Sequence, residues 1–352
     1  MKQLPAAVLA AALASTAASG AVAQSFPKTQ LNVVGNLGIT TQSKDLEAPF
    51  WSKLIPEATG GAVTAQFKPW NEMGLKGPEV IKLLRQGLYD IGTTQLGFLA
   101  GDNAINDAID LAGVAPTIQE FEKVKNAFRP HLEAYYEKQQ GAKVLALTSY
   151  QAQVLYCRPE FKGLQDLKGR KVRVSGASQA DFVEYFGGSG VNMPFGDVQQ
   201  ALQNGVIDCA ITGTLGGYKA KWFEGAKYLY PLGINWASGI VAASQKSWSK
   251  MPPALQDLLK KEYPKYEARI LEQNIRENDL GIACNTGTAA CSEGPAANMT
   301  LVPVKQSDLE LRRKALDDRV LPRWAARCGE ACVKAWNETA GKVTGLTAIA
   351  SK

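Results

Sequence analysis

The sequence contains a single histidine, His131, among 352 residues. It lies in an Arg-Pro-His run, which predicts a turn. A Ser-His-Asp triad needs a histidine base, and HExxH and similar zinc sites need two histidines. The sequence therefore offers little for most hydrolases to use. We expect no metal site and no cofactor.

The chain also lacks long runs of basic residues and, beyond its N-terminus, long runs of apolar residues. No run of five Lys or Arg residues occurs, and the 39 basic residues exceed the 33 acidic ones only modestly, for a net charge of +6. Such a balance does not predict a nucleic-acid partner. Beyond the N-terminus, no segment reaches eighteen consecutive apolar residues, so we expect the mature chain to stay out of the membrane.

The N-terminus has the layout of a secretory signal peptide. Lys2 precedes an apolar stretch over residues 4–14, and small residues end at Ala23. A buried helix or a membrane anchor is the alternative, but a stretch this short does not span a bilayer about 30 Å thick. The sequence predicts a signal peptide over residues 1–23 and a periplasmic mature protein.

Six cysteines, an even number, suit an oxidising compartment. Their spacing suggests local disulfides between Cys284 and Cys291 and between Cys328 and Cys332. Cys157 and Cys209 would then be left to pair with each other. Fifteen connectivities are open to six cysteines, so this pairing is a hypothesis. A zinc site is less well supported because CxxC spacing is absent, and a redox role for Cys328 and Cys332 lacks the usual two-residue separation.

Apolar periodicity predicts an α/β fold of two domains. Strand patterns over 31–35, 63–67, 143–147 and 171–174 alternate with helical patterns, which favours parallel pairing. The runs LLRQGLYD (83–90) and ALQNGVID (201–208) each place a glycine after a helix and an aspartate three residues later. This echo suggests two lobes of similar construction. No low-complexity linker separates them, so we expect short ordered crossings.

The C-terminal third is predicted to be largely helical. Apolar residues recur at helical spacing from residue 254 to about 283, and Pro264 should kink this long helix, which would brace both lobes. A second amphipathic and charged stretch, over residues 307–336, should pack on the outside.

Arg173 is the residue best suited to hold an anion. It lies between Val172 and Val174 in a short strand, so its side chain points away from theirs. Arginine matches a carboxylate with two parallel charged hydrogen bonds. A surface arginine on an edge strand is the alternative that the spacing leaves open.

Three central runs resemble the solute-binding proteins of TRAP transporters, the dicarboxylate-binding type. They are GLQDLKGRKVRV (163–174), GVNMPFGDV (190–198) and ALQNGVID (201–208), and the N-terminal runs EATGG (57–61) and GLYDI (87–91) are similar to that family too. The resemblance implies a two-lobed periplasmic binding protein fold, type II-like. It also implies capture of an organic acid between the lobes and its delivery to a membrane permease.

The resemblance implies roles for individual residues. Arg173 matches the carboxylate-binding arginine, Phe195 an aromatic pocket residue, and Thr212 a polar ligand contact. Gln153 lies near a position where some members carry a second arginine. That departure weighs against a C4-dicarboxylate or sialic acid as the ligand, although Arg158 is close.

Aromatic residues near the expected crossings are further candidates for the pocket wall, although aromatics are more often core. We consider Trp70, Tyr150 and Trp236. If several of them line the cleft, a flat or apolar carboxylate, such as an aromatic or 2-oxo acid, is favoured over a small dicarboxylate.

The resemblance places lobe I at residues 24–150 plus about 239–278, and lobe II at residues 151–238 plus about 279–352. The leading interpretation is a binding protein without catalysis. An exported carboxylate-processing enzyme and a ligand sensor on the same scaffold are the alternatives.

Overall fold

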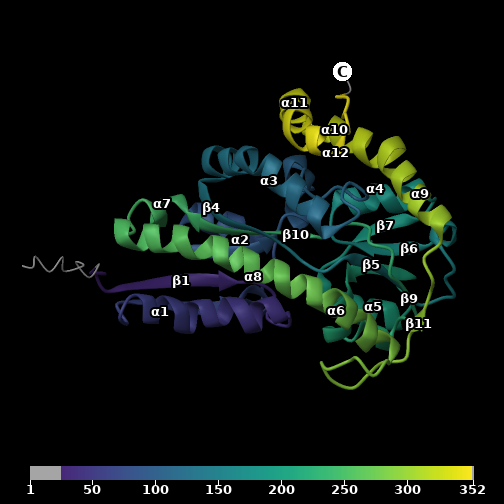
Figure 1. The fold of residues 1–352 in the computed structure, drawn as a ribbon, viewed down its shortest axis with the longest axis horizontal. Coiled ribbons are helices and arrows are strands. Elements are labelled where there is room, and N and C mark those ends of the chain that lie inside the picture. Colours follow the sequence, from purple (N-terminus) through teal and green to yellow (C-terminus); the bar gives the residue numbers. More distant parts are fainter. Residues whose placement is uncertain (1–24, 351–352) are drawn as a thin grey trace, which may run out of the picture.

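The structure, a computed structural model, describes residues 25–350 as two β-sheets covered by helices (Figure 1). The predicted signal peptide lies outside these residues. None of the described helices has both the length and the apolar composition that a membrane span requires. The predicted α/β class with a long helix is confirmed.

The first sheet has five strands in the order β2-β1-β3-β10-β4. Their bounds are β1 Thr29–Gly35, β2 Val63–Pro69, β3 Ile91–Gln95, β4 Ala142–Ser149 and β10 Ser238–Ser244. The second sheet has six strands in the order β11-β9-β5-β8-β6-β7. Their bounds are β5 Gln153–Cys157, β6 Lys171–Val174, β7 Ser189–Asn192, β8 Cys209–Gly213, β9 Tyr228–Tyr230 and β11 Thr300–Leu301.

Both sheets are mixed, which corrects the expectation of parallel pairing alone. β1 pairs in parallel with β2 and β3, and β6 with β7 and β8, as helix-connected strands do. β10 instead runs antiparallel to β3 and β4, and β5 runs antiparallel to β8 and β9. β5 and β10 are the strands that each sheet receives directly from the other, without a crossover helix.

Twelve α-helical segments occur among the described residues. Their bounds are α1 Ile55–Ala58, α2 Glu79–Gln86, α3 Ile118–Tyr135, α4 Ala177–Tyr185, α5 Val198–Gln203, α6 Thr214–Lys219, α7 Gln245–Trp248, α8 Pro253–Thr286, α9 Gln306–Ala315, α10 Leu321–Cys328, α11 Glu330–Trp336 and α12 Lys342–Thr344. The predicted turn at His131 is wrong. Pro130 and His131 lie inside α3, whose packing against the core through Phe128 and Leu132 offsets the hydrogen bond that proline removes.

Helix α8 spans 34 residues, about 50 Å at 1.5 Å per residue. It continues through Pro264, and a kink there stays a prediction. It lies along β4 of the first sheet and ends against α6 and β9 of the second (Figure 1). One helix therefore touches both lobes, as expected of a brace.

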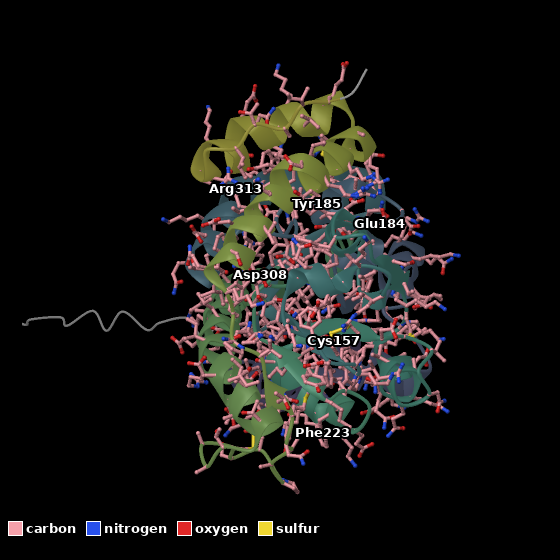
Figure 2. All side chains as sticks on the ribbon, turned by 90° about the vertical axis from the view of Figure 1, so that its right-hand side faces the viewer. Cys157, Glu184, Tyr185, Phe223, Asp308 and Arg313 are labelled. Carbon is pink, nitrogen blue, oxygen red and sulfur yellow. A yellow bond between two sulfur atoms is a disulfide. The ribbon has the colours of Figure 1, made fainter. Side chains whose placement is uncertain are left out.

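The C-terminal helices also contact both halves of the chain. The indole nitrogens of Trp324 and Trp336 donate to the carbonyls of Ala104 and Ala108, each at 2.8 Å. On the other side they meet α4, where Tyr185 and its neighbour Glu184 lie beneath them in Figure 2. The charged stretch thus covers the outside, as predicted.

All three predicted disulfides are present. Cys157 and Cys209 are register partners on the neighbouring strands β5 and β8. The other two bridges join Cys284 to Cys291 and Cys328 to Cys332, and no described cysteine is free. The first bridge fixes two central strands of the second sheet, one residue along from the pairing of Arg173 with Ala210.

Candidate functional site

A pocket lies between the two sheets, where the first crossing connects β4 to β5. The first sheet and the crossing contribute only uncharged residues: Asn36, Leu37, Thr40, Thr41, Gln42, Trp70, Gln95, Phe98, Tyr150 and Gln151. The second sheet and its helices contribute Gln153, Arg173, Ser175, Phe195, Thr212, Gly213, Leu215, Gly216 and Lys219. Water centres can occupy about 40 Å³ of it.

Arg173 lies at the wall of this pocket and is only 1% exposed. Its strand β6 is flanked by β7 and β8, so the alternative of an edge-strand surface arginine is wrong. Nε donates to the carbonyl of Met193 at 3.0 Å, and Nη1 donates to the carbonyl of Ile211 at 2.8 Å. Of the five N–H groups of a guanidinium, the other three have no acceptor among residues 25–350.

No carboxylate in the described chain pairs with Arg173. Burial lowers the pKa of its guanidinium to about 9, and no acidic side chain offsets that effect. The side chain stays cationic at neutral pH. A buried, unneutralised cation with unused donors favours an anion at this wall.

Two aromatic rings hold the guanidinium in place. Its central carbon lies 6.0 Å from the ring centroid of Phe195 and 5.6 Å from that of Trp222. The two rings are 5.2 Å apart. Cation–π attraction stabilises the charge without consuming its hydrogen-bond donors.

The opposite wall is held by a hydrogen-bond network around Asn36. Its Oδ1 accepts a hydrogen bond from the Tyr150 hydroxyl at 2.8 Å, and its backbone N–H donates to Glu47 at 2.6 Å. Gln42 donates to the carbonyl of Ser149 and to the side chain of Asn274 on α8. This wall is thereby fixed both to the crossing and to the long helix.

Gln153 and Thr212 lie on the adjacent strands β5 and β8, one residue out of register with each other. Gln153 opposes Gly213, and Thr212 opposes Val154. A Cβ on Gly213 would lie 2.5 Å from Oε1 of Gln151, so a larger residue here would displace that side chain. The polar ends of both strands therefore open into the pocket.

The structure brings together six of the seven sequence-predicted site residues: Arg173, Phe195, Thr212, Gln153, Trp70 and Tyr150. Their contact with a ligand stays a prediction. Trp236 does not line the pocket, because its indole N–H donates to the carbonyl of Ala115 at 3.0 Å within the core. Arg158 is also outside it, half exposed and 3.5 Å from Asp208.

Sequence reasoning missed Lys219, Gln95 and Trp222. Lys219 is the last residue of α6, and its ammonium pairs with Glu293. No local pattern marks these positions, because each depends on a segment distant in sequence. Among the described residues, no three His, Cys, Asp or Glu side chains form a metal-type cluster.

Two sheets joined by short crossings, with an anion-attracting pocket between them, define a two-lobed binding protein. Comparison with protein families agrees. Residues 38–285 match the bacterial extracellular solute-binding proteins, family 7, and the chain belongs to this family. The resemblance to TRAP solute-binding proteins is thus confirmed.

Solved structures of similar fold are solute receptors. A TRAP periplasmic solute-binding protein of Rhodoferax ferrireducens with bound malonate is 17% identical, with a TM-score of 0.78 over 90% of this chain and 98% of that one. A Bordetella pertussis receptor that binds pyroglutamic acid is 20% identical, with a TM-score of 0.75 over 88% and 99%. A Desulfovibrio salexigens protein with bound orotic acid is 17% identical, with a TM-score of 0.76 over 89% and 99%.

Proposed function

We propose that this protein is the periplasmic receptor of a TRAP transporter, which captures a small organic acid between its lobes and delivers it to the membrane permease. The observation that carries the proposal is Arg173, a buried cation with three unused N–H donors and no acidic partner in the described chain. A carboxylate supplies the acceptors and the charge that this side chain lacks.

The ligand is proposed to be a compact carboxylate with a flat or apolar body, such as an aromatic or 2-oxo acid. Trp70, Phe98, Tyr150 and Phe195 supply aromatic surface, and water centres can occupy only about 40 Å³ of the cavity. Cyclic monocarboxylates occupy two proteins of similar fold, as pyroglutamic acid and orotic acid. These ligands lead the panel to be tested.

A binding role without catalysis is proposed because the pocket wall contains no histidine, cysteine or carboxylic acid among the described residues. These are the commonest general bases, and the lysine of the wall, Lys219, is paired with Glu293 instead of with a hydroxyl nucleophile. Ligand would shift an open state toward the closed one that a permease recognises. An exported protein should begin at Gln24, which N-terminal sequencing of the periplasmic fraction tests.

The test is binding of the mature chain to a panel of monocarboxylates, dicarboxylates, 2-oxo acids, sugar acids and neutral analogues. We expect acids alone to raise the melting temperature. Arg173→Met should weaken the best acid by at least about 2 kcal/mol, or about thirty-fold, because its carboxylate is left poorly paired. Calorimetry measures the loss.

Two variants control this test. Arg158→Met removes a cation of the same sheet from outside the pocket and should leave affinity unchanged. Arg173→Lys keeps the charge but cannot donate two parallel hydrogen bonds to one carboxylate, so it should retain only part of the affinity. Affinity that is indifferent to Arg173, or product formation from any acid, would overturn the proposal. Acid binding without interaction with reconstituted permease would instead favour a sensor.

A further inference from the structure

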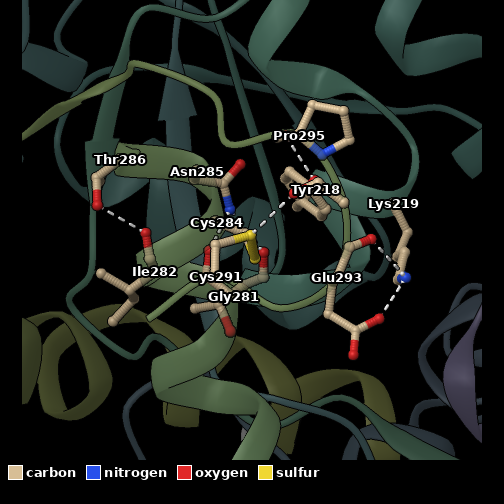
Figure 3. Close-up of a disulfide and its surroundings, with 12 residues drawn as sticks. Tyr218, Lys219, Gly281, Ile282, Cys284, Asn285, Thr286, Cys291, Glu293 and Pro295 are labelled. Carbon is tan, nitrogen blue, oxygen red and sulfur yellow. Dashed lines mark hydrogen bonds and ion pairs between the residues drawn. A yellow bond between two sulfur atoms is a disulfide. The ribbon is translucent and has the colours of Figure 1, made fainter. Parts of the chain in front are cut away.

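Lys219 gives the pocket a second cation, and that cation is already neutralised. Its ammonium pairs with the Glu293 carboxylate and lies 3.4 Å from the Glu293 carbonyl oxygen (Figure 3). Both side chains are about three quarters buried. Lys219 therefore differs from Arg173, for which the described chain supplies no acid.

Glu293 lies on a largely exposed loop that is tethered on both sides of this residue. The Cys284–Cys291 disulfide closes the chain just before it, and the Tyr218 hydroxyl donates to the carbonyl of Pro295 at 2.7 Å just after it (Figure 3). Gly281 of α8 also touches the start of α6, where a Cβ would lie 2.3 Å from the amide nitrogen of Leu215. The carboxylate is thus presented to Lys219 by fixed backbone on both sides.

A further acid contacts the pocket residue Gln151. Glu277 accepts a hydrogen bond from Gln151 at 2.6 Å. Burial raises its pKa, and the charge of Glu293 acts in the same direction. Glu277 and Glu293 therefore place two carboxyl groups next to the pocket residues Gln151 and Lys219.

We propose that the Lys219–Glu293 pair makes the pocket selective for an acid of single negative charge whose second polar group is neutral. This inference rests on the proposed function. Lys219 is the only cation besides Arg173 in the described pocket wall, and it already has an acidic partner. A second carboxylate that approached Lys219 would therefore also approach Glu293, and like charges brought together are unfavourable. Lys219 keeps one N–H for it, because the other two donate to the carbonyl and the carboxylate of Glu293, but the charge of Lys219 is already offset.

Neutral groups of the pocket suit such a ligand. Gln95 lines the wall, and its side-chain amide makes no hydrogen bond to residues 25–350. Gln153 uses only its amide nitrogen, which donates to the carbonyl of Gln151 at 2.9 Å, and leaves its oxygen as an acceptor. Together with the Thr212 hydroxyl, they offer donors and acceptors for an amide, lactam, keto or hydroxyl group.

The test uses ligand pairs of the same shape but different charge: malonamate with malonate, succinamate with succinate, and glutaramate with glutarate. Affinities are measured by calorimetry at neutral pH, where the carboxylates are ionised. Of the three amide acids, the one that the wild type binds most tightly should bind at least about ten-fold more tightly than the diacid of the same pair. Glu293→Gln releases Lys219 and should raise the diacid-to-amide affinity ratio at least about ten-fold.

The double variant Glu293→Gln/Lys219→Met is the matched control and should return the ratio to that of the wild type. Melting temperatures of all variants establish that they fold. A wild type that prefers the diacid, or a ratio that Glu293→Gln leaves unchanged, would overturn the inference. So would binding of other panel acids but of neither member of any pair, because shape alone would then decide.

The Arg173→Met variant separates this failure from failure of the proposed function. Acid binding that depends on Arg173, with a ratio indifferent to Glu293, refutes only the charge selectivity. Absence of any acid binding by the wild type refutes the proposed function, and the selectivity falls with it.

Discussion

Lys125 and Arg173 are both buried cations, and they differ in what surrounds them. The Lys125 ammonium lies 2.7 Å from Glu122 and 3.8 Å from Glu267. Glu267 also accepts two hydrogen bonds from Arg129, at 2.8 and 2.6 Å, and one from the backbone N–H of Leu147. This cluster joins α3, β4 and α8. Arg173, in contrast, donates hydrogen bonds to two backbone carbonyls and lies against two aromatic rings.

The difference separates cations that hold the fold from a cation kept for another purpose. Removing a charge from water costs several kcal/mol, and an acidic partner offsets much of this cost. Helices α3 and α8, which pack beside the first sheet, supply such partners to each other. The second sheet supplies none at Arg173, which is what a carboxylate-binding wall requires.

The largest expected effect is loss of stability when the paired cluster is broken. Glu267→Ala leaves Lys125 and Arg129 without their shared acid and should lower the free energy of unfolding by about 3 kcal/mol. Urea denaturation measures it. Asp257→Ala, which breaks an exposed pair on the same helix, should change stability by well under 1 kcal/mol. Equal effects of the two variants would remove the distinction drawn here.

Glu47 extends the comparison to an acid without a cation. It accepts hydrogen bonds from Thr93 and Asn36, yet burial, the larger effect, raises its pKa from 4.5 to about 7. The folded state thus binds more protons than the unfolded state between pH 4.5 and 7. The contribution of Glu47 to stability is therefore present at low pH and lost as pH rises through about 7.

Relative to Glu47→Gln, the wild type should thus lose about 1 to 3 kcal/mol of unfolding free energy between pH 5 and 8. Urea denaturation of both proteins across this range gives the difference. Asp107 and Asp110, whose pKa values burial also raises to about 7, titrate in both proteins and cancel. Parallel pH profiles would contradict the assignment.

The smallest expected effect is on the stability of the ligand-free Arg173→Met variant. Relief of a buried charge opposes the loss of hydrogen bonds to Met193 and Ile211, so the free energy of unfolding should stay within about 1 kcal/mol of the wild type. Denaturation without any acid measures this. A loss comparable to that of Glu267→Ala would make Arg173 a structural residue like Lys125.

Much of the fold could be predicted because local patterns were strong. Apolar spacing indicates the helix before Gly87 and the strand that contains Arg173. Gly87 ends the helix with a positive φ of 79°, which glycine adopts readily. Cysteine spacing gave the three disulfides. The reversed strands β5 and β10 could not be inferred, because their direction depends on where the chain re-enters each sheet.

The site was predictable only where one residue carries the chemistry alone. Arg173 could be found from its strand and from the family resemblance. Lys219 could not, because its partner Glu293 lies 74 residues away, on a loop positioned by tertiary contacts. The prediction that Trp236 lines the pocket failed for a related reason. Trp236 lies near a crossing, but its indole N–H donates to the carbonyl of Ala115 in the core.

The distribution of charge over the pocket has a kinetic consequence. Both cations of the wall, Arg173 and Lys219, lie on the side of the second sheet, and the first sheet contributes only neutral groups. On the proposed mechanism, an acid arriving before the lobes close is attracted by one half alone. Its association rate is then set by that half and by ionic strength, whereas its residence time depends both on its pairing with Arg173 and on the neutral wall that closes over it.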